Sequence, residues 1–363
     1  MAETARISPR YPIIDAHLDL AYSAVVLGRD LSLPIDVLRQ VERQAGSADP
    51  KAGTPTVTLP ALLTGRVAVA GGSIFVEPGK RSHPRPTATY HTPEEAHHQA
   101  TQQLDTYRRM ADEREDVALV SDRAALDRIL ESWGTDHPTL GIFIVMEGAE
   151  PILNPRELSW WVERGLRGIA LSWAAGTRYA GGNASPGPIT DDGHALLHAM
   201  ADTQLLLDIS HLWEEAAHTA LDRYPGPIVA THANPRAFVN SPRMLTDDLI
   251  RRIVEREGVI GVVACNSMLE PGWHPGQPRV PLMRMVEAID HICQIAGHAE
   301  AAGIGSDLDG GFGLESIPAE LSSAADLVLF EGILRERGYS ESDIQGIVGG
   351  NWLRVMRQVL EAF

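Results

Sequence analysis

Short apolar runs that end in a polar or acidic side chain recur along this chain. The first, residues 12–20, starts with two isoleucines and finishes in His-x-Asp. Because alternate residues of an extended chain face the same way, His17 and Asp19 can point at one spot. An imidazole and a carboxylate side by side at a strand end form half of a divalent metal site. The motif also occurs by chance, so its weight depends on the runs that follow.

Seven further runs share the pattern of the first, and helical segments separate most of them. The runs cover residues 67–76, 141–146, 168–173, 205–210, 227–231, 259–265 and 302–306. The helical segments include residues 31–44, 123–132 and 155–164, a helix capped by Thr92, and the tail 340–363. Strands alternating with helices favour a parallel sheet, and eight such units predict a closed (β/α)8 TIM barrel.

Three other segments complete the predicted fold. Residues 117–120 are expected to form an accessory strand, and residues 78–93 and 174–192 are expected to be loops at the barrel rim. Loops at the carboxyl ends of barrel strands surround the active site, so these two should shape the substrate pocket. Since α/β barrels reach this length as one domain, residues 1–363 are expected to form a single barrel domain.

Composition narrows the classes of function. The 44% hydrophobic and 22% charged residues are typical of a soluble globular enzyme. A formal net charge of −17 repels phosphate backbones and anionic lipid, so we expect neither a nucleic-acid nor a membrane partner. Residues 1–10 lack the apolar core of a signal peptide, and no run approaches the ~20 apolar residues of a membrane span. We therefore expect a cytoplasmic protein, and a homodimer is compatible with the sequence.

The ends of the predicted strands carry the candidate chemistry. They present three imidazoles and three carboxylates: His17, Asp19, Glu147, His211, His232 and Asp307. Each residue alone could be a structural hydrogen bonder, but six buried polar groups on one rim would be costly without metal. The set exceeds the needs of one ion and predicts two divalent ions that share a carboxylate. Nitrogen and oxygen ligands without thiolate favour Zn2+, with Mn, Co or Fe as substitutes.

From about residue 12 to its C-terminus, the chain resembles the renal, or membrane, dipeptidase family, peptidase family M19 of the amidohydrolase superfamily. The matching segments are residues 14–19 (IDAHLD), 146–148 (MEG), 207–211 (LDISH), 231–232 (TH), 305–310 (GSDLDG) and 350–355 (GNWLRV). The resemblance implies His17 and Asp19 on one zinc ion and His211 and His232 on the other. It also implies that Glu147 bridges both ions.

The same resemblance assigns roles around the metal pair. It implies that Asp307 is the catalytic acid that handles the proton of the bridging water. It implies that Asp208, with Ser210, orients the ring of His211. Arg243 lies eleven residues after His232, the spacing at which the family holds the substrate carboxylate. The alternative for Arg243 is an exposed arginine at a helix edge.

Two positions depart from the family pattern. Trp173 stands where the family has a histidine that polarises the scissile carbonyl, and an indole has one N–H donor and cannot become cationic. Loss of such a donor can cost about two to three orders of magnitude in rate. The tyrosine expected after the seventh strand is replaced by Cys265 or Asn266. Arg178, in the loop after Trp173, is a candidate substrate contact that could compensate.

These observations predict zinc-dependent hydrolysis of a small amide, most simply a dipeptide, by a metal-bridging hydroxide. Trp173 keeps two alternatives open: action on a non-peptide amide or lactone, or a weakly active pseudoenzyme. Trp173 could equally be a packing residue that narrows the pocket. The sequence does not choose among substrates, because the rim loops determine the side chains that fit.

Overall fold

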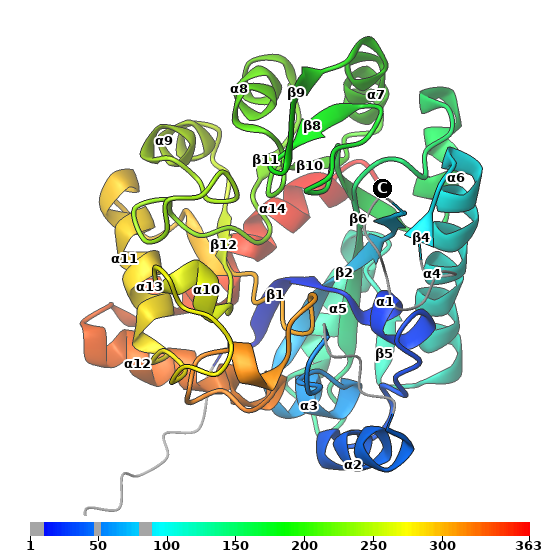
Figure 1. Ribbon diagram of the computed structural model, residues 1–363. Helices are drawn as coiled ribbons and strands as arrows, with labels where there is room; N and C mark the ends of the chain where they lie inside the picture. The colour runs from blue at the N-terminus through cyan, green and yellow to red at the C-terminus, as the bar shows by residue number, and fades with distance from the viewer. Residues whose placement is uncertain (1–10, 47–51, 80–88) are drawn as a thin grey trace, which may run out of the picture.

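The computed structural model of the protein, which describes residues 11–46, 52–79 and 89–363, contains a nearly closed barrel of eight parallel strands (Figure 1). The strands follow the order β11-β10-β7-β6-β2-β1-β13-β12, and a bridge between Ala230 and Ile260 joins the two ends. The predicted TIM barrel is therefore confirmed. The barrel strands are β1 (Ile13–Leu18), β2 (Val67–Phe75), β6 (Leu140–Glu147), β7 (Leu166–Ala170), β10 (Leu206–Asp208), β11 (Ile228–Val229), β12 (Ile260–Val262) and β13 (Ala302–Ile304).

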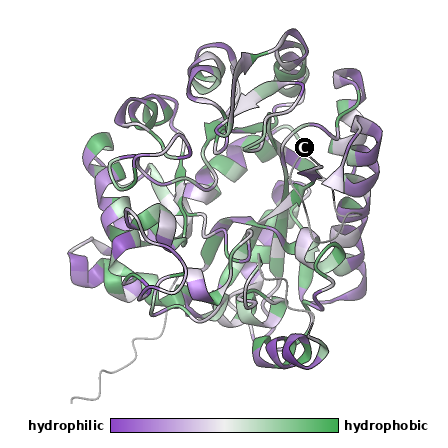
Figure 2. Ribbon diagram, in the orientation of Figure 1, coloured by the Kyte–Doolittle hydropathy of each residue, from purple (hydrophilic) through white to green (hydrophobic). Residues whose placement is uncertain are grey.

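The strands are buried on both faces, as their continuous apolar runs require. Every residue of β1, β2 and β6 is buried, because one face fills the barrel and the other lies under helices. Figure 2 shows this arrangement as mostly green strands inside peripheral helices with much purple on them. The register pairs Phe75 with Glu147 and Glu147 with Ala170, so three neighbouring strands end at one level.

Helices surround the barrel where the periodicity indicated them. The hydroxyl of Thr92 accepts a hydrogen bond from the Glu95 amide at 3.3 Å, which confirms the predicted cap. The helix expected over residues 31–44 begins later, after Pro34. The helices are α1 (Leu20–Val25), α2 (Ile35–Ala45), α3 (Leu59–Thr64), α4 (Pro93–Glu113), α5 (Arg123–Ser132), α6 (Leu158–Glu163), α7 (Asp191–Asp202), α8 (Glu214–Arg223), α9 (Asp247–Glu255), α10 (Asn266–Leu269), α11 (Met283–Ala296), α12 (Leu329–Arg337), α13 (Glu341–Gln345) and α14 (Asn351–Leu360).

The glycine-rich segment 174–192 is not the irregular loop that we expected. It contains the antiparallel hairpin β8 (Ala180–Gly182) and β9 (Ser185–Ile189), and α7 begins at its end. A Cβ atom on Gly181 would lie 2.3 Å from the amide nitrogen of Gly187, so the close pairing requires glycine there. Glycine is depleted in ordinary strands, which is why the sequence pattern indicated a loop.

The remaining expectations have mixed outcomes. The predicted accessory strand is β5 (Val117–Leu119), which pairs in parallel with the first three residues of β6, Leu140–Ile142. The ends of the predicted loop 78–93 form β3 (Glu77–Pro78) and β4 (Thr89–Tyr90), whereas residues 80–88 lie outside the described part of the chain. The N-terminal residues 1–10 also lie outside it. None of the helices in the described ranges is long and apolar enough to cross a membrane.

Candidate active site

Five predicted ligands converge at the carboxyl ends of the barrel strands. His17 lies in β1, Asp19 follows that strand, and Glu147 closes β6. The imidazoles of His211 and His232 come from the segments that follow β10 and β11. All five residues are at most 9% exposed, so they form a buried polar centre.

Glu147 is the middle of this centre. One of its carboxylate oxygens, Oε1, lies 3.0 Å from Nε2 of His211 and 3.4 Å from Nε2 of His232. The other oxygen, Oε2, lies 3.5 Å from Nε2 of His17. Oε1 thus faces the imidazoles of His211 and His232, and Oε2 faces the imidazole of His17. A carboxylate shared by two cations needs this arrangement.

In the described part of the chain the donor atoms form three overlapping groups that could each hold an ion, with the ligand atoms of each within 4.8 Å of one another. One group is His17, Asp19 and Glu147, another is Glu147, His211 and His232, and the third is His17, Asp208 and His232. Nε2 of His17 is buried and makes no hydrogen bond within the described ranges. A buried imidazole nitrogen without a donor or acceptor partner is costly, and a metal ion at this point would satisfy it. The residues present therefore fit two divalent ions.

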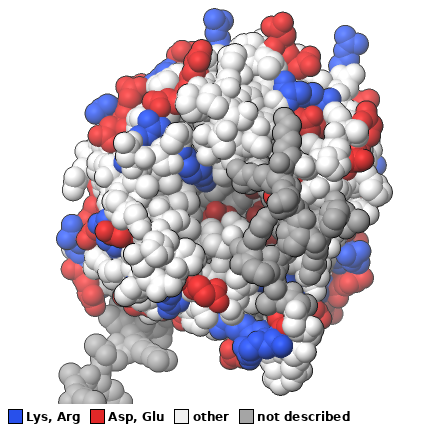
Figure 3. All heavy atoms as spheres, viewed as in Figure 1, with Lys and Arg blue, Asp and Glu red and all other residues white. Residues whose placement is uncertain are grey.

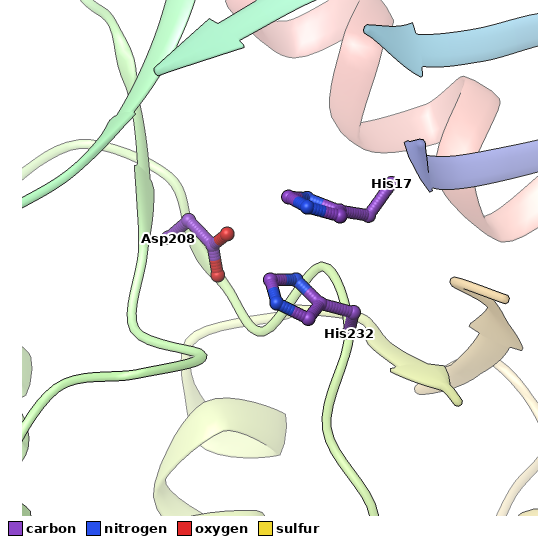
Figure 4. Close-up of side chains that lie close together, drawn as sticks. All are labelled: His17, Asp208 and His232. Carbon is purple, nitrogen blue, oxygen red and sulfur yellow. The ribbon is translucent and has the colours of Figure 1, made fainter. Parts of the chain in front are cut away.

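Asp208 also lies near this centre, but its oxygens are already occupied. Its Oδ1 accepts hydrogen bonds from the Ser210 amide at 3.0 Å, the Ser210 hydroxyl at 2.5 Å and the Thr231 amide at 3.0 Å. Its Oδ2 accepts the Thr231 hydroxyl at 2.5 Å. Figure 4 shows this carboxylate facing the rings of His17 and His232, whose centroids are 3.7 Å apart. Asp208 is thus an outer partner of the ligands rather than a ligand.

The Thr231 hydroxyl links the carboxylate of Asp208 to the ring of His232 through two hydrogen bonds. Because the Thr231 hydroxyl donates to Asp208, it can only accept from Nδ1 of His232, which lies 2.8 Å away. Nδ1 of His232 must then carry the proton, which leaves the Nε2 lone pair facing Glu147. We expected Asp208 and Ser210 to orient the ring of His211, and this expectation is wrong. Asp208 acts through the hydroxyl of Thr231, which follows β11 and contacts the ring of His232.

The outer partner of His211 is Asn183, which the sequence reasoning missed. Nδ1 of His211 and Oδ1 of Asn183 are 3.0 Å apart, and the backbone amide of Asn183 donates to the His211 carbonyl at 2.9 Å. 

Two backbone hydrogen bonds hold the hairpin that carries Asn183 against the segment of His211. One runs from the Asn183 amide to the His211 carbonyl, and the other runs from the Trp213 amide to the Gly181 carbonyl at 3.0 Å. An asparagine in a glycine-rich segment carries no sequence signal for this role, because the contact exists only once the hairpin has folded over His211.

Electrostatics prepare the centre for cations. Burial raises the pKa of Glu147, but the three imidazoles outweigh it and hold that pKa well below its usual value. Burial lowers the pKa of His211 to about 4 and, with the charge of His17, holds the pKa of His232 well below normal. Burial opposes the charge on His17 too, yet Glu147 and Asp19 raise its pKa to about 10. At neutral pH the centre has an ionised bridge and two neutral imidazoles.

Asp307 contributes a carboxyl group of a different kind. Burial, together with the charges of Asp19 and Glu147, raises its pKa well above the usual value, against the effect of His17. Its backbone has a φ of 57°, and a Cβ atom on Gly310 would lie 1.9 Å from its Oδ1. Glycine at position 310 therefore leaves the space that the carboxyl group occupies. A carboxyl on the cavity wall that takes up a proton readily suits proton transfer.

A cavity of about 570 Å³ opens onto these groups. Figure 3 shows a hollow in the middle of the face, with acidic atoms visible inside it. The guanidinium of Arg243 is held by the carbonyls of Ser210 at 2.8 Å and His232 at 2.7 Å, and the side chain lines the cavity. Seven of the residues that the sequence analysis proposed for the site line this cavity: Asp19, Glu147, Trp173, His211, Arg243, Cys265 and Asp307.

Two expected substrate contacts do not line this cavity. The Arg178 side chain donates to the carbonyls of Glu150 at 3.1 Å and Ile152 at 2.5 Å, and it borders a neighbouring cavity. Arg178 therefore does not replace the missing imidazole. Asn266 is fully buried, and neither polar atom of its side chain has a hydrogen-bond partner in the described part of the chain. Of the two residues at the expected tyrosine position, Cys265 is the one on the cavity wall.

Comparisons with known proteins agree with this architecture. Residues 1–362 match the profile of the family described as Membrane dipeptidase (Peptidase family M19). An uncharacterised protein in the pqqA 5' region of Klebsiella pneumoniae is 31% identical over 213 residues, which cover 56% of this chain and 76% of that protein. Dipeptidase tcpJ of Claviceps purpurea is 24% identical over 318 residues, which cover 84% of this chain and 69% of that protein. The matched segments of three further relatives span 39% to 52% of those proteins.

A solved structure shows the same fold over nearly the whole chain. It is a metallopeptidase from Rhodobacter sphaeroides, liganded with a phosphinate mimic of the dipeptide L-Ala-D-Ala. Its TM-score is 0.78 at 22% identity, with 96% of this chain and 99% of that chain covered.

Proposed function

Because the chain belongs to the membrane dipeptidase family, peptidase family M19, we propose that it is a zinc-dependent dipeptidase with two metal ions. The observation that carries the proposal is the position of Glu147, which lies between two sets of ligands and presents a different oxygen to each. Family membership supports dipeptidase-type hydrolysis by a metal-dependent enzyme, and the donor set supports zinc because it contains nitrogen and oxygen but no thiolate.

Each ligand has a defined place in the proposal. His17 and Asp19 would hold one ion, His211 and His232 would hold the other, and Glu147 would contact both. Two such ions would supply an activated water at neutral pH and polarise the peptide carbonyl.

Arg243 positions the substrate in this proposal. Its side chain is partly buried, and its bonds to two backbone carbonyls fix its orientation before a ligand arrives. A planar guanidinium can bind a carboxylate through two parallel hydrogen bonds. The free C-terminal carboxylate of a dipeptide is such a group, and binding it at Arg243 places the peptide bond toward Glu147.

Asp307 moves the proton. As a carboxylate on the cavity wall it takes a proton from the attacking water, and as the acid it delivers that proton to the nitrogen of the leaving amino acid. Its raised pKa makes Asp307 a better proton acceptor than an ordinary carboxylate, which favours uptake of the proton from the attacking water.

Trp173 supports a second candidate function, the hydrolysis of a non-peptide amide or lactone. Its ring lies on the wall beside His211, with ring centroids 6.1 Å apart, where the resemblance expects a histidine. Without that imidazole, a substrate with a less demanding leaving group would be easier to hydrolyse.

A substrate panel separates the two functions. Zinc-loaded protein is offered L,L and L,D dipeptides beside lactones and N-acyl amino acids, and release of free amino acids is measured. We expect dipeptide cleavage. Cleavage of lactones or N-acyl compounds alone would favour the second function, and no cleavage of any substrate by protein that holds two ions would indicate a pseudoenzyme.

A further inference from the structure

We propose that Asn183 donates a hydrogen bond from its side-chain amide to the carbonyl oxygen of the scissile bond as that oxygen becomes negative. This inference rests on the proposed dipeptidase function and adds to it a donor that comes from the rim hairpin rather than from a barrel strand. The tetrahedral intermediate of amide hydrolysis carries a negative oxygen, and N–H donors aimed at that oxygen stabilise it.

The hairpin holds Asn183 between two segments of the cavity wall. A Cβ atom on Gly182 would lie 2.0 Å from the carbonyl oxygen of Trp173, so the hairpin packs closely on the segment after β7. The backbone amide of Asn183 donates to the His211 carbonyl at 2.9 Å, which joins the hairpin to the segment after β10. The side chains of Trp173, Asn183 and His211 all line the cavity, so Asn183 lies on the wall beside a proposed metal ligand.

The ring of His211 sets the orientation of the Asn183 side chain. Nε2 of His211 lies 3.0 Å from Oε1 of Glu147, and its lone pair would bind a metal ion. The proton of the neutral imidazole is then on Nδ1, which lies 3.0 Å from Oδ1 of Asn183. Oδ1 therefore accepts a hydrogen bond from this ring, and the two N–H groups of Nδ2 are left for another partner. Within residues 11–46, 52–79 and 89–363, Nδ2 donates no hydrogen bond.

Other donors of the cavity wall have different tasks. The guanidinium of Arg243 donates to the carbonyls of Ser210 and His232, and the proposed function assigns it to the substrate carboxylate. The thiol of Cys265 is a weak donor. Among the described residues that line the cavity, Asn183 is the one that has a side-chain amide. Its two N–H groups are therefore the donors that the geometry leaves for the substrate carbonyl.

A neutral donor suits a wall that faces cations. A cationic side chain beside His211 would repel the metal ion that this ring is proposed to hold, and the repulsion is strong where water is largely excluded. An amide stabilises a negative oxygen and adds no net charge. The indole of Trp173, whose ring centroid lies 6.1 Å from that of His211, adds apolar surface at the same place. A hydrogen bond formed beside such a surface is stronger than one formed in water.

Substitution can separate the two ends of the amide. Asn183→Asp keeps an oxygen that accepts from Nδ1 of His211 and removes both N–H groups, whereas Asn183→Ala removes the acceptor and the donors. At full zinc occupancy, checked by metal analysis, both variants should lose about a hundredfold to a thousandfold in kcat on Ala-Ala. KM should change little, because the hydrogen bond strengthens only as the oxygen becomes negative.

Zinc affinity distinguishes the proposed donor from the contact with His211. In a competition titration with a chelator, Asn183→Ala should bind zinc about tenfold to a hundredfold more weakly, because His211 loses its outer partner. Asn183→Asp retains that partner, and its zinc affinity should not fall. Ser185→Asp is the matched control, because it places the same charge at an exposed position two residues along the hairpin and should retain both kcat and zinc affinity.

A tetrahedral analogue measures the same contact without turnover. A phosphinate analogue of Ala-Ala carries negative oxygens on a tetrahedral phosphorus, as the intermediate does on carbon. Its Kd for the zinc-loaded protein, measured by calorimetry, should rise in both Asn183 variants by about the factor by which kcat/KM falls.

The outcomes separate the inference from the function beneath it. An unchanged kcat in Asn183→Ala at full zinc occupancy would overturn the inference and leave the dipeptidase in place. A loss confined to Asn183→Asp would also overturn it, since the added charge would then be the cause. If the zinc-loaded original protein hydrolyses no dipeptide, the proposed function fails, and phosphinate binding alone tests the donor. Weaker binding by Asn183→Ala than by the original protein would support the inference, and equal Kd values would overturn it.

Discussion

Replacing Thr231 with valine would remove one hydroxyl from the metal centre and keep the shape of the side chain. That hydroxyl donates to Asp208 at 2.5 Å and accepts from Nδ1 of His232 at 2.8 Å. All three residues are at most 3% exposed, so water would not replace the lost contacts. The substitution leaves one carboxylate oxygen and one imidazole N–H with a missing partner.

The magnitude follows from those two groups. Each buried group that loses its partner costs about 1–3 kcal/mol, so the free energy of unfolding of the metal-free protein should fall by about 2–6 kcal/mol. The ring of His232 also loses the contact that sets its tautomer, and outer partners of this kind are worth about tenfold to a hundredfold in metal affinity. Zinc affinity should therefore fall by that factor.

The assay uses urea denaturation of metal-free protein and a competition titration with a chromogenic zinc chelator. Thr231→Ser retains the hydroxyl and should behave much like the original protein in both measurements. Thr64→Val makes the same chemical change at an exposed helical threonine, whose hydroxyl bonds the Pro60 carbonyl at 2.8 Å, and should change neither by much. If Thr231→Val matched Thr64→Val in zinc affinity, the link from Asp208 through Thr231 to His232 would be refuted.

Four further predictions follow from the site. Asp307→Asn should retain both metals and lose nearly all turnover, which paired metal analysis and dipeptide assays would check; retained activity would remove Asp307 from the mechanism. Gly310→Ala should lower kcat at unchanged metal content, because the added Cβ would fall 1.9 Å from Oδ1 of Asp307; an unchanged kcat would contradict this packing. Since His17 in metal-free protein has a pKa of about 10, zinc must displace its proton below that pH, so affinity should rise with pH up to about 10. Calorimetry in two buffers of different ionisation enthalpy should detect the released proton. Trp173→His should raise kcat/KM on ordinary dipeptides if it restores a polarising imidazole, and an unchanged value would make Trp173 a packing residue.

The barrel and the convergence of the proposed metal ligands were predictable because both depend on local patterns. Buried parallel strands need continuous apolar runs, and the residues that end them meet at one rim, so His17, Glu147 and His232 could be grouped before their distances were known. The outer partners were less predictable. Asp208 is three residues from His211 in sequence, but its carboxylate acts through Thr231, which only the pairing of β10 with β11 brings near.

The rim was the least predictable part of the structure. Asn183 reaches His211 only because a glycine-rich hairpin folds back over that ligand, a pairing that strand propensities disfavour. Arg178 was expected in the pocket because it follows Trp173 closely, but the carbonyls of Glu150 and Ile152 hold its side chain toward a different cavity. Side-chain direction at such positions depends on contacts between distant segments, which periodicity does not encode.

The most direct test of the account is the anomalous scattering of crystals of zinc-loaded protein, recorded on both sides of the zinc absorption edge. Two peaks should lie on either side of Glu147, one contacted by His17 and Asp19 and the other by His211 and His232. A single peak, or peaks that Glu147 does not contact, would contradict the shared carboxylate on which the proposed chemistry depends.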